Sequence, residues 1–344
     1  MNHGFSGFTV ALATLGLLAS PGIVSVAAQA PAKVTRSART WTPPKTSWGD
    51  PDLSGTYTNK YEQRTPMERP PDLAGRRIED ITADELEDIV QARQRQVIAR
   101  QPFAGGDPEG RIGYGIQWTD MLSVHGAHRP WFVTEPSDGQ IPPMTPEAQQ
   151  RVSRRNATAR TGRGPADSYE DRSLYDRCIT RGLPGSMLPS NYGNSFQIVQ
   201  SPGRVAIIYE MIHETRVIPL DGSAHVGKSL RLEMGDARGH WEGNALVVET
   251  TNFTERGAYR NANPDTLRLV ERFTRTAPGT VEWAVTFDDP STWTRPWTFS
   301  LPLTMDPQEP VFEYACHEGN YAIPNILSAA RAEEKAAEAA KRQK

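Results

Sequence analysis

Several common markers of function are scarce in this chain of 344 residues. Basic and acidic side chains number 38 and 41, and the formal charge of −3 gives no electrostatic reason to expect nucleic acid or an anionic membrane as a partner. The dinucleotide fingerprint G-x-G-x-x-G and the hydrolase turn G-x-S-x-G are missing. A dinucleotide-dependent dehydrogenase or an α/β-hydrolase is therefore disfavoured.

Charge is also absent from the first 30 residues, which contain no Lys, Arg, Asp or Glu. Residues 8–20 form a short apolar run, and small residues lead from it to Ala30, as in a signal peptide. The run is shorter than the ~20 apolar residues that a membrane helix needs. We expect residues 1–30 to be a cleaved signal, the protein to be periplasmic or secreted, and no membrane span to remain. An uncleaved anchor is the alternative.

The only two cysteines are Cys178 and Cys316. In an oxidising compartment, the simplest interpretation is a disulfide that joins the middle of the chain to its last strand. The chain-entropy model assigns such a bridge roughly 4–5 kcal/mol. A catalytic thiol at Cys316, beside His317, is the alternative, although an exported free thiol is easily oxidised.

Composition divides the rest of the chain into four stretches. Residues 31–80 are an extended, Pro-rich leader, and residues 81–190 are irregular with two expected helices, 81–100 and 145–160. The basic run of the second helix predicts a solvated face, with an anionic partner as the alternative. Residues 191–327 form the expected β domain, and residues 328–344 an Ala/Glu/Lys helical tail.

Short segments with a period of two begin near residue 195. Turn sequences such as SPG, APG and DDP separate them. The glycine-rich stretch 235–244 predicts a tight hairpin. The expected strands are 196–201, 204–212, 214–219, 245–252, 266–275, 280–287, 295–303 and 311–316.

This spacing is typical of an antiparallel meander. We therefore expect a mainly β protein, either a calycin- or lipocalin-like barrel or a strongly curved sheet. An irregular, partly helical N-terminal part is expected to pack on its mouth.

Segments along residues 48–331 resemble a family of exported bacterial proteins that are uncharacterised. The segments are WGDPDLSGTY, RCITRGLP, QIVQSPGRVAIIYEMIHETRVIPLDG, GDARGHWEGNALVVETTNF, LVERFTR, DDPSTWTRPW and EYACHEGNY. The resemblance implies a β-rich periplasmic protein and brings no activity with it.

Three of the seven histidines stand beside a glutamate at the ends of strand-like runs: His213-Glu214, His240 with Glu242, and His317-Glu318. Such pairs can exchange protons near neutral pH. Adjacent residues of a strand point to opposite faces, so only His240 and Glu242 share one automatically. We take His213, His317, Glu318 and His240 as candidate catalytic residues. The alternatives are a surface pair of Glu214 with Arg216, a solvated turn and a strand-end cap.

Trp293, Arg295 and Trp297 alternate, so in one strand all three project from one face. An arginine between two indoles suits a carboxylate, a sugar or a conjugated ring. Arg216 and Tyr314 complete the expected substrate-binding residues. A stacked arginine at the edge of the core is the alternative.

Metal-binding patterns such as H-x-H and H-E-x-x-H do not occur, and HGAH at 125–128 favours an exposed loop. We expect no metal and no other cofactor, although the His-Glu pairs could converge on a metal.

These observations favour a periplasmic, cofactor-independent enzyme, namely a lyase, isomerase or hydrolase. Its substrate is expected to be a small cyclic, aromatic or sugar-like molecule, transformed by His/Glu acid–base chemistry. The alternative is a periplasmic small-molecule-binding protein whose barrel cavity holds a ligand without turnover. In both cases the partner is a small molecule, and neither nucleic acid nor a membrane.

Overall fold

The computed structural model describes residues 41–99, 126–161 and 164–343. The expected signal peptide and the first part of the leader lie outside these residues, as do residues 100–125. Within the described part of the chain, no helix is both long and apolar enough to cross a membrane.

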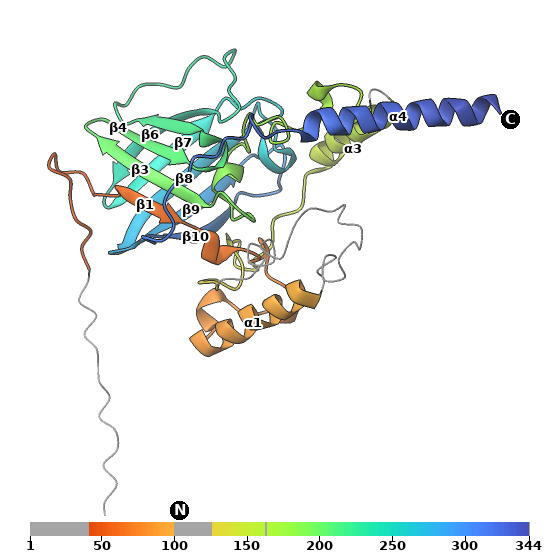
Figure 1. The fold of residues 1–344 in the computed structure, drawn as a ribbon. Coiled ribbons are helices and arrows are strands. Elements are labelled where there is room, and N and C mark those ends of the chain that lie inside the picture. The colour runs from red at the N-terminus through yellow and green to blue at the C-terminus, as the bar shows by residue number, and fades with distance from the viewer. Residues whose placement is uncertain (1–40, 100–125, 162–163, 344) are drawn as a thin grey trace, which may run out of the picture. The chain divides into compact units, whose positions relative to one another are not determined.

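The described chain is mainly β and contains one antiparallel sheet of ten strands (Figure 1). Nine of them follow the order β5-β4-β3-β1-β10-β9-β8-β7-β6, and β2 pairs with β10. The strands are β1 Gly55–Thr58, β2 Val133–Glu135, β3 Ser195–Ser201, β4 Arg204–Tyr209, β5 Thr215–Pro219, β6 Asp236–Glu242, β7 Ala245–Thr251, β8 Arg268–Ala277, β9 Thr280–Asp288 and β10 Trp297–Thr304. Two meanders, β3 to β5 and β6 to β10, are thus joined through β1.

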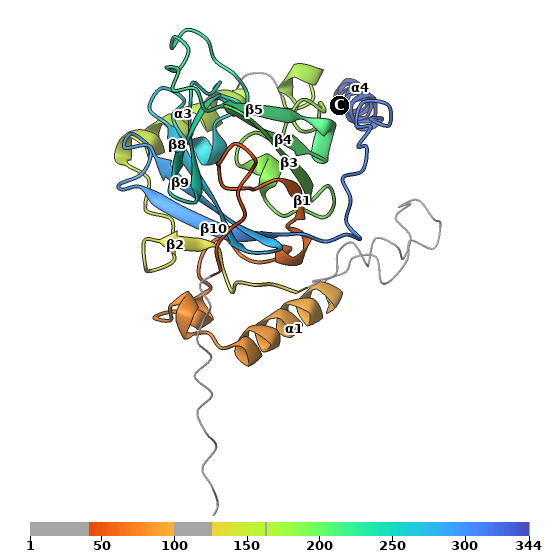
Figure 2. The ribbon, with the colours of Figure 1, turned by 90° about the vertical axis from the view of Figure 1, so that its left-hand side faces the viewer.

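The sheet is curled but not closed (Figure 2). Its edge strands β5 and β6 are not hydrogen-bonded to each other in the described structure, yet they pack closely. A Cβ atom added to Gly239 of β6 meets Ile218 Cγ2 of β5 at 2.8 Å, so a larger residue there pushes the edges apart. The expected curved antiparallel sheet is confirmed, in its open form.

Aromatic side chains fill the inside of the curl. Phe287 of β9 stacks on Trp297 of β10 with ring centroids 4.2 Å apart, and Trp283 meets Phe299 edge-on at 5.5 Å. All four are fully buried. Burying one such side chain contributes roughly 1.5–3 kcal/mol, so this core fixes the strands from which the candidate sites extend.

The described α-helices are α1 Ala83–Ala99, α3 Pro146–Thr161 and α4 Ala322–Arg342. Short 3₁₀ helices cover Lys60–Glu62, Pro71–Leu73, Ile78–Asp80, Tyr169–Asp171, Gly185–Met187, Met211–His213 and Tyr259–Asn261. Thr145 caps α3, because its Oγ1 accepts from the N–H of Ala148 at 3.1 Å. The helices expected over 81–100 and 145–160 are confirmed, and the tail helix begins earlier than expected.

One expected strand is absent from the described residues, and one expected hairpin also contains a strand. Residues 311–316 alternate like a strand, but they are irregular and pair with no strand in the described structure. Residues 235–244 are not only a hairpin: they contain strand β6, and the turn lies at Gly243, whose φ is 60°. Gly239 does not lie in the turn, and its lack of a side chain allows β6 to pack closely on β5.

Candidate functional site

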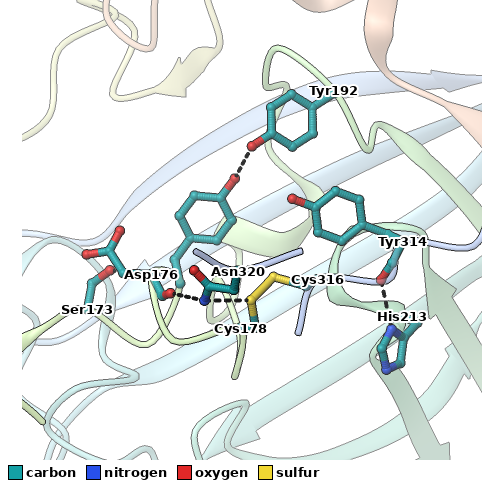
Figure 3. Close-up of a disulfide and its surroundings, with 9 residues drawn as sticks. Ser173, Asp176, Cys178, Tyr192, His213, Tyr314, Cys316 and Asn320 are labelled. Atoms are coloured by element: carbon teal, nitrogen blue, oxygen red, sulfur yellow. Dashed lines mark hydrogen bonds between the residues drawn. A yellow bond between two sulfur atoms is a disulfide. The ribbon is translucent and has the colours of Figure 1, made fainter. Parts of the chain in front are cut away.

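Cys178 and Cys316 form a disulfide, which confirms the expected pairing (Figure 3). Their Cα atoms are 5.7 Å apart, within the usual range. Asn320 Nδ2 donates to Asp176 O at 2.8 Å and to Cys178 Sγ at 3.3 Å. The disulfide and the side-chain amide of Asn320 together hold the irregular segment around Cys316 against the loop that precedes β3.

Three tyrosines cluster beside this disulfide. The hydroxyls of Tyr175 and Tyr192 lie 3.0 Å apart, and the ring of Tyr192 stacks on that of Tyr314 with centroids 5.8 Å apart (Figure 3). Burial and then the hydrogen bond to Tyr192 raise the pKa of Tyr175, and the same causes raise the pKa of Tyr314 to about 12. At neutral pH, Tyr175 and Tyr314 therefore offer ring faces and protonated hydroxyls.

Arg181 lies in this cluster, and none of the acidic residues that the structure describes pairs with it. Its guanidinium carbon is 5.5 Å from the ring centroid of Tyr175. Its side chain makes no ion pair or hydrogen bond with the described residues, and Nη1 is buried without an acceptor. Burial lowers the pKa of Arg181, opposed by the surrounding Tyr175, Tyr192, Tyr259 and Tyr314. A guanidinium that loses hydration without gaining an acceptor is costly, and this makes Arg181 a candidate anion site.

His213 is held beside the same cluster. Left-handed backbone at Ile212 and His213, with φ of 62° and 46°, turns the chain sharply between β4 and β5. His213 Nδ1 lies 3.0 Å from Tyr314 O (Figure 3). A carbonyl only accepts, so Nδ1 carries the hydrogen, and Nε2 of the neutral ring keeps its lone pair. The exposed imidazole can therefore act as a base through Nε2.

The sequence neighbour of His213 does not orient it. Glu214 Oε2 accepts instead from Thr180 Oγ1 at 2.6 Å. Burial raises the pKa of Glu214, against the opposing effects of Thr180 and Arg216. Glu214 is therefore a partly buried carboxylate beside the Arg181 loop, and not the partner of an imidazole.

The alternative interpretation, a surface pair of Glu214 with Arg216, is wrong. Arg216 is 5% exposed and donates through Nη2 to Glu271 Oε2 at 2.5 Å and to Thr250 Oγ1 at 3.0 Å. Both partners lie inside the curled sheet. This placement gives no support to the expected substrate-binding role of Arg216.

His240 and Glu242 share one face of β6, as the alternation predicts. His240 Nε2 lies 3.1 Å from Glu242 Oε1, and Arg272 Nη1 donates to Glu242 Oε2 at 2.7 Å. The side chains of His240 and Glu242 are 60% and 50% exposed, which is typical of a solvated surface network.

His317 and Glu318 are exposed in the irregular segment that follows the disulfide. Neither side chain has a hydrogen bond or an ion pair within the described ranges 41–99, 126–161 and 164–343. The structure brings neither of them into contact with His213.

Trp293, Arg295 and Trp297 do not share a face, because β10 begins only at Trp297 and a bend at Thr294 and Arg295 precedes it. The two indoles are buried with ring centroids 5.6 Å apart, whereas Arg295 is exposed and reaches Asp138 Oδ2 at 3.3 Å. The combination of an arginine with aromatic walls occurs instead at Arg181.

One histidine–carboxylate pair was missed by sequence reasoning. His128 Nδ1 lies 2.6 Å from Glu62 Oε1, and the N–H of His128 donates to the same oxygen at 3.0 Å. Glu62 is 1% exposed. The hydrogen bond between Glu62 and His128 raises the pKa of His128, although burial of the imidazole opposes this shift. The two residues are 66 positions apart, and no local pattern connects them.

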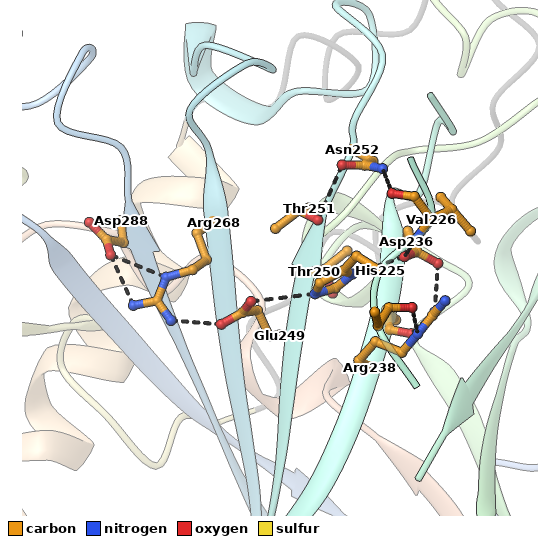
Figure 4. A network of polar contacts seen from close by, with 12 residues as sticks. His225, Val226, Asp236, Arg238, Glu249, Thr250, Thr251, Asn252, Arg268 and Asp288 are labelled. Carbon is orange, nitrogen blue, oxygen red and sulfur yellow. Dashed lines mark hydrogen bonds and ion pairs between the residues drawn. The ribbon is translucent and has the colours of Figure 1, made fainter. Parts of the chain in front are cut away.

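A second missed histidine joins the loop after β5 to the sheet (Figure 4). His225 Nδ1 lies 2.8 Å from Asp236 Oδ2, and its Nε2 lies 3.4 Å from Glu249 Oε1. Arg238 pairs with Asp236 at 2.6 Å, and Arg268 with Glu249 at 2.7 Å. Each carboxylate thus has an arginine as well as the histidine, an arrangement that fits a structural network.

Residues 222–229, GSAHVGKS, match the phosphate-binding pattern G-x-x-x-x-G-K-S. The pattern binds phosphate where the loop leads from a strand into a helix whose first N–H groups face the anion. Here the loop leads from β5 to strand β6, Lys228 is exposed, and His225 contacts Asp236. The context of a nucleotide-binding loop is therefore missing.

Groups of three or more His, Cys, Asp or Glu side chains that could hold a metal ion are not found in the described part of the chain. Of the HGAH histidines, His125 lies outside the described residues and His128 contacts Glu62.

Comparison with known proteins gives no match: neither a family model, nor a curated protein, nor a solved structure matches this chain. Membership of the exported bacterial family therefore stays a prediction from the quoted segments.

Proposed function

We propose that this protein binds a small anionic molecule with a cyclic or aromatic body at a site centred on Arg181. The main support is the guanidinium of Arg181, which is partly buried and has no acceptor among the described residues. A bound carboxylate supplies that acceptor. Hydrogen bonds to charged groups contribute about 1.5–3 kcal/mol each, enough to hold a small ligand weakly.

The surrounding tyrosines support a flat body for the ligand. Tyr175 lies under the guanidinium, and the stacked pair Tyr192 and Tyr314 offers further ring faces. Aromatic contacts at centroid separations of roughly 4.5–7 Å contribute about 0.5–1.5 kcal/mol beyond burial. A ligand whose ring packs against these tyrosines and whose anionic group points toward Arg181 contacts both the aromatic rings and the guanidinium.

The disulfide supports a preformed site. Cys316 is two positions after Tyr314, and its bridge to Cys178 fixes both segments that carry the cluster. A site that needs little ordering on binding keeps more of its interaction energy as affinity. The signal-like residues 1–30 and the disulfide also support a periplasmic or secreted location for this binding.

Thermal unfolding with benzoate, and with benzamide as its neutral isostere, tests this proposal. Benzoate is expected to raise the unfolding midpoint of the wild type and of Arg177→Met, a matched variant of another arginine over a tyrosine ring. Arg181→Met should remove the effect of benzoate, and benzamide should have none. Equal effects of the two probes, or a full benzoate effect in Arg181→Met, contradict the proposal.

A second candidate function is acid–base turnover of the same ligand by a lyase, isomerase or hydrolase. The observation in its favour is His213, whose Nδ1–H···O=C bond to Tyr314 leaves Nε2 available as a base. Incubation with a metabolite extract, followed by mass spectrometry, checks it. Product formation by the wild type that is lost in His213→Gln, with benzoate binding retained, supports turnover. Equal product formation by both proteins contradicts it.

A further inference from the structure

A pocket of about 690 Å³ shares no lining residue with the Arg181 cluster. Its walls come from α3, from residues 253–255 after β7 and from residues 261–265 before β8. This volume lies within the range of roughly 300–1,000 Å³ that is typical of small-molecule sites.

Positive charge dominates the pocket. Four arginines line it: Arg151, Arg154, Arg155 and Arg231. Two carboxylates, Glu255 and Asp265, also line it, so four positive and two negative charges leave a net charge of +2. Asp265 is already engaged by Arg231, with Nη2 and Oδ1 2.5 Å apart. The three arginines of α3 are spaced i, i+3 and i+4 and so extend from one helix face.

Asn261 anchors two of these arginines. Its carbonyl accepts from Arg151 Nη2 at 3.2 Å, and its side-chain oxygen accepts from Arg155 Nη2. Arg151 Nη2 also donates to Thr292 Oγ1 at 2.7 Å, while its Nη1 is buried and has no hydrogen-bond partner among the residues that the structure describes. The pocket therefore contains a positioned guanidinium with an unused donor.

The backbone of this wall is strained. Arg260 and Asn261 both have left-handed φ, of 51° and 65°, although neither is glycine. Strained residues of this kind cluster at ligand sites, where the surrounding structure holds them in place. Here the strain presents the carbonyl and side-chain oxygens of Asn261 to the two arginines.

We infer that this pocket binds the phosphate group of a small phosphorylated metabolite. A phosphate monoester carries nearly two negative charges at neutral pH, which matches the net charge of the pocket, and its oxygens fit the donor forks of arginine. The volume exceeds what a free phosphate fills, and apolar residues such as Phe253 and Pro264 complete the lining. The ester body therefore adds to the affinity.

Calorimetric titration at low salt with glucose 6-phosphate, inorganic phosphate and glucose tests this inference. We expect glucose 6-phosphate to bind several-fold more tightly than inorganic phosphate, glucose not to bind, and the affinity to fall with added salt. Absence of glucose 6-phosphate binding overturns the inference. Equal affinity for the ester and for inorganic phosphate overturns the assignment of an ester ligand.

Variants locate the binding. Arg155→Gln, at an exposed position of α3, should weaken glucose 6-phosphate binding about tenfold, as expected for the loss of one charged contact of about 1.4 kcal/mol. Arg295→Gln, an exposed arginine outside the pocket, should bind like the wild type. Wild-type affinity in Arg155→Gln overturns the inference. Loss of binding in Arg181→Met alone assigns the phosphate to the Arg181 site and overturns it as well.

Discussion

Arg216 Nη2 on β5 lies 2.5 Å from Glu271 Oε2 on β8, and the two strands are not neighbours in the sheet. Trp283 Nε1 donates to the other oxygen of Glu271 at 3.1 Å. Because β5 is an edge strand, this buried pair connects one edge to the opposite half of the sheet through the interior. It makes up for backbone hydrogen bonds that β5 and β6 do not form with each other in the described structure.

Removing one member of the Arg216–Glu271 pair should destabilise the fold strongly. Arg216→Met leaves the Glu271 carboxylate buried and unpaired, and we expect a loss of about 3–5 kcal/mol of unfolding free energy by urea denaturation. The double variant Arg216→Met/Glu271→Gln should recover much of this loss, because glutamine is uncharged and still accepts from Trp283. A double variant as unstable as the single one contradicts the account of an unpaired charge.

Removal of the disulfide should affect both stability and the Arg181 site. We expect Cys178→Ala/Cys316→Ala to lose roughly 4–5 kcal/mol of unfolding free energy, because the unfolded chain is no longer constrained. The response to benzoate should weaken in folded protein, since Tyr314 is no longer held. Thiol labelling of the denatured, unreduced wild type provides the control, and two free thiols there contradict the bridge.

Asp236 should contribute stability that is lost in acid. Burial raises its pKa, but hydrogen bonds from the Val226 N–H, His225 and Arg238 outweigh burial and lower the pKa below the ordinary value of about 3.9. A folded-state pKa below the unfolded one stabilises the fold above the unfolded pKa, and this stabilisation is lost as the pH falls through the folded pKa. In urea unfolding at successively lower pH, the stability gap between wild type and Asp236→Asn should shrink below about pH 4. A gap that stays constant contradicts this role.

His128 should show the opposite pH dependence. Its hydrogen bond to Glu62 raises the pKa above the ordinary value of about 6.5. The stabilisation of the fold by protonated His128 is complete below the pKa of this residue in the unfolded chain. It is lost as the pH rises through the pKa of His128 in the folded protein. An NMR titration should give a midpoint above about 6.5 for His128, and Glu62→Gln should lower it. A midpoint that does not change in Glu62→Gln means that Glu62 does not set the pKa.

The fold was largely predictable because alternation is a local signal. In β9, Val281, Trp283 and Val285 point inward as expected, since β9 is paired with β8 and β10, and both neighbours keep the period of two. The same signal failed at 311–316, which pair with no strand of the described structure, and glycines obscured β6. Whether a segment becomes a strand depends on its partners, and these are distant in sequence.

The candidate site was less predictable for the same reason. The sequence placed His213 and His317 at strand ends, but His213 lies in a turn with left-handed backbone and His317 in an irregular segment. The structure instead pairs His128 with the distant Glu62. Arg181 carried no pattern of its own in the sequence. Its closeness to Cys178, three positions earlier, was the one available signal, because the disulfide brings Tyr314 to that loop.

The most direct test of the central claim is a crystal structure of the protein soaked with 4-bromobenzoate, in which the anomalous signal of bromine locates the ligand. We expect a carboxylate within hydrogen-bonding distance of the Arg181 guanidinium and a ring against Tyr192 and Tyr314. Ligand found only elsewhere, or an empty Arg181 site at a concentration that saturates binding in solution, contradicts it.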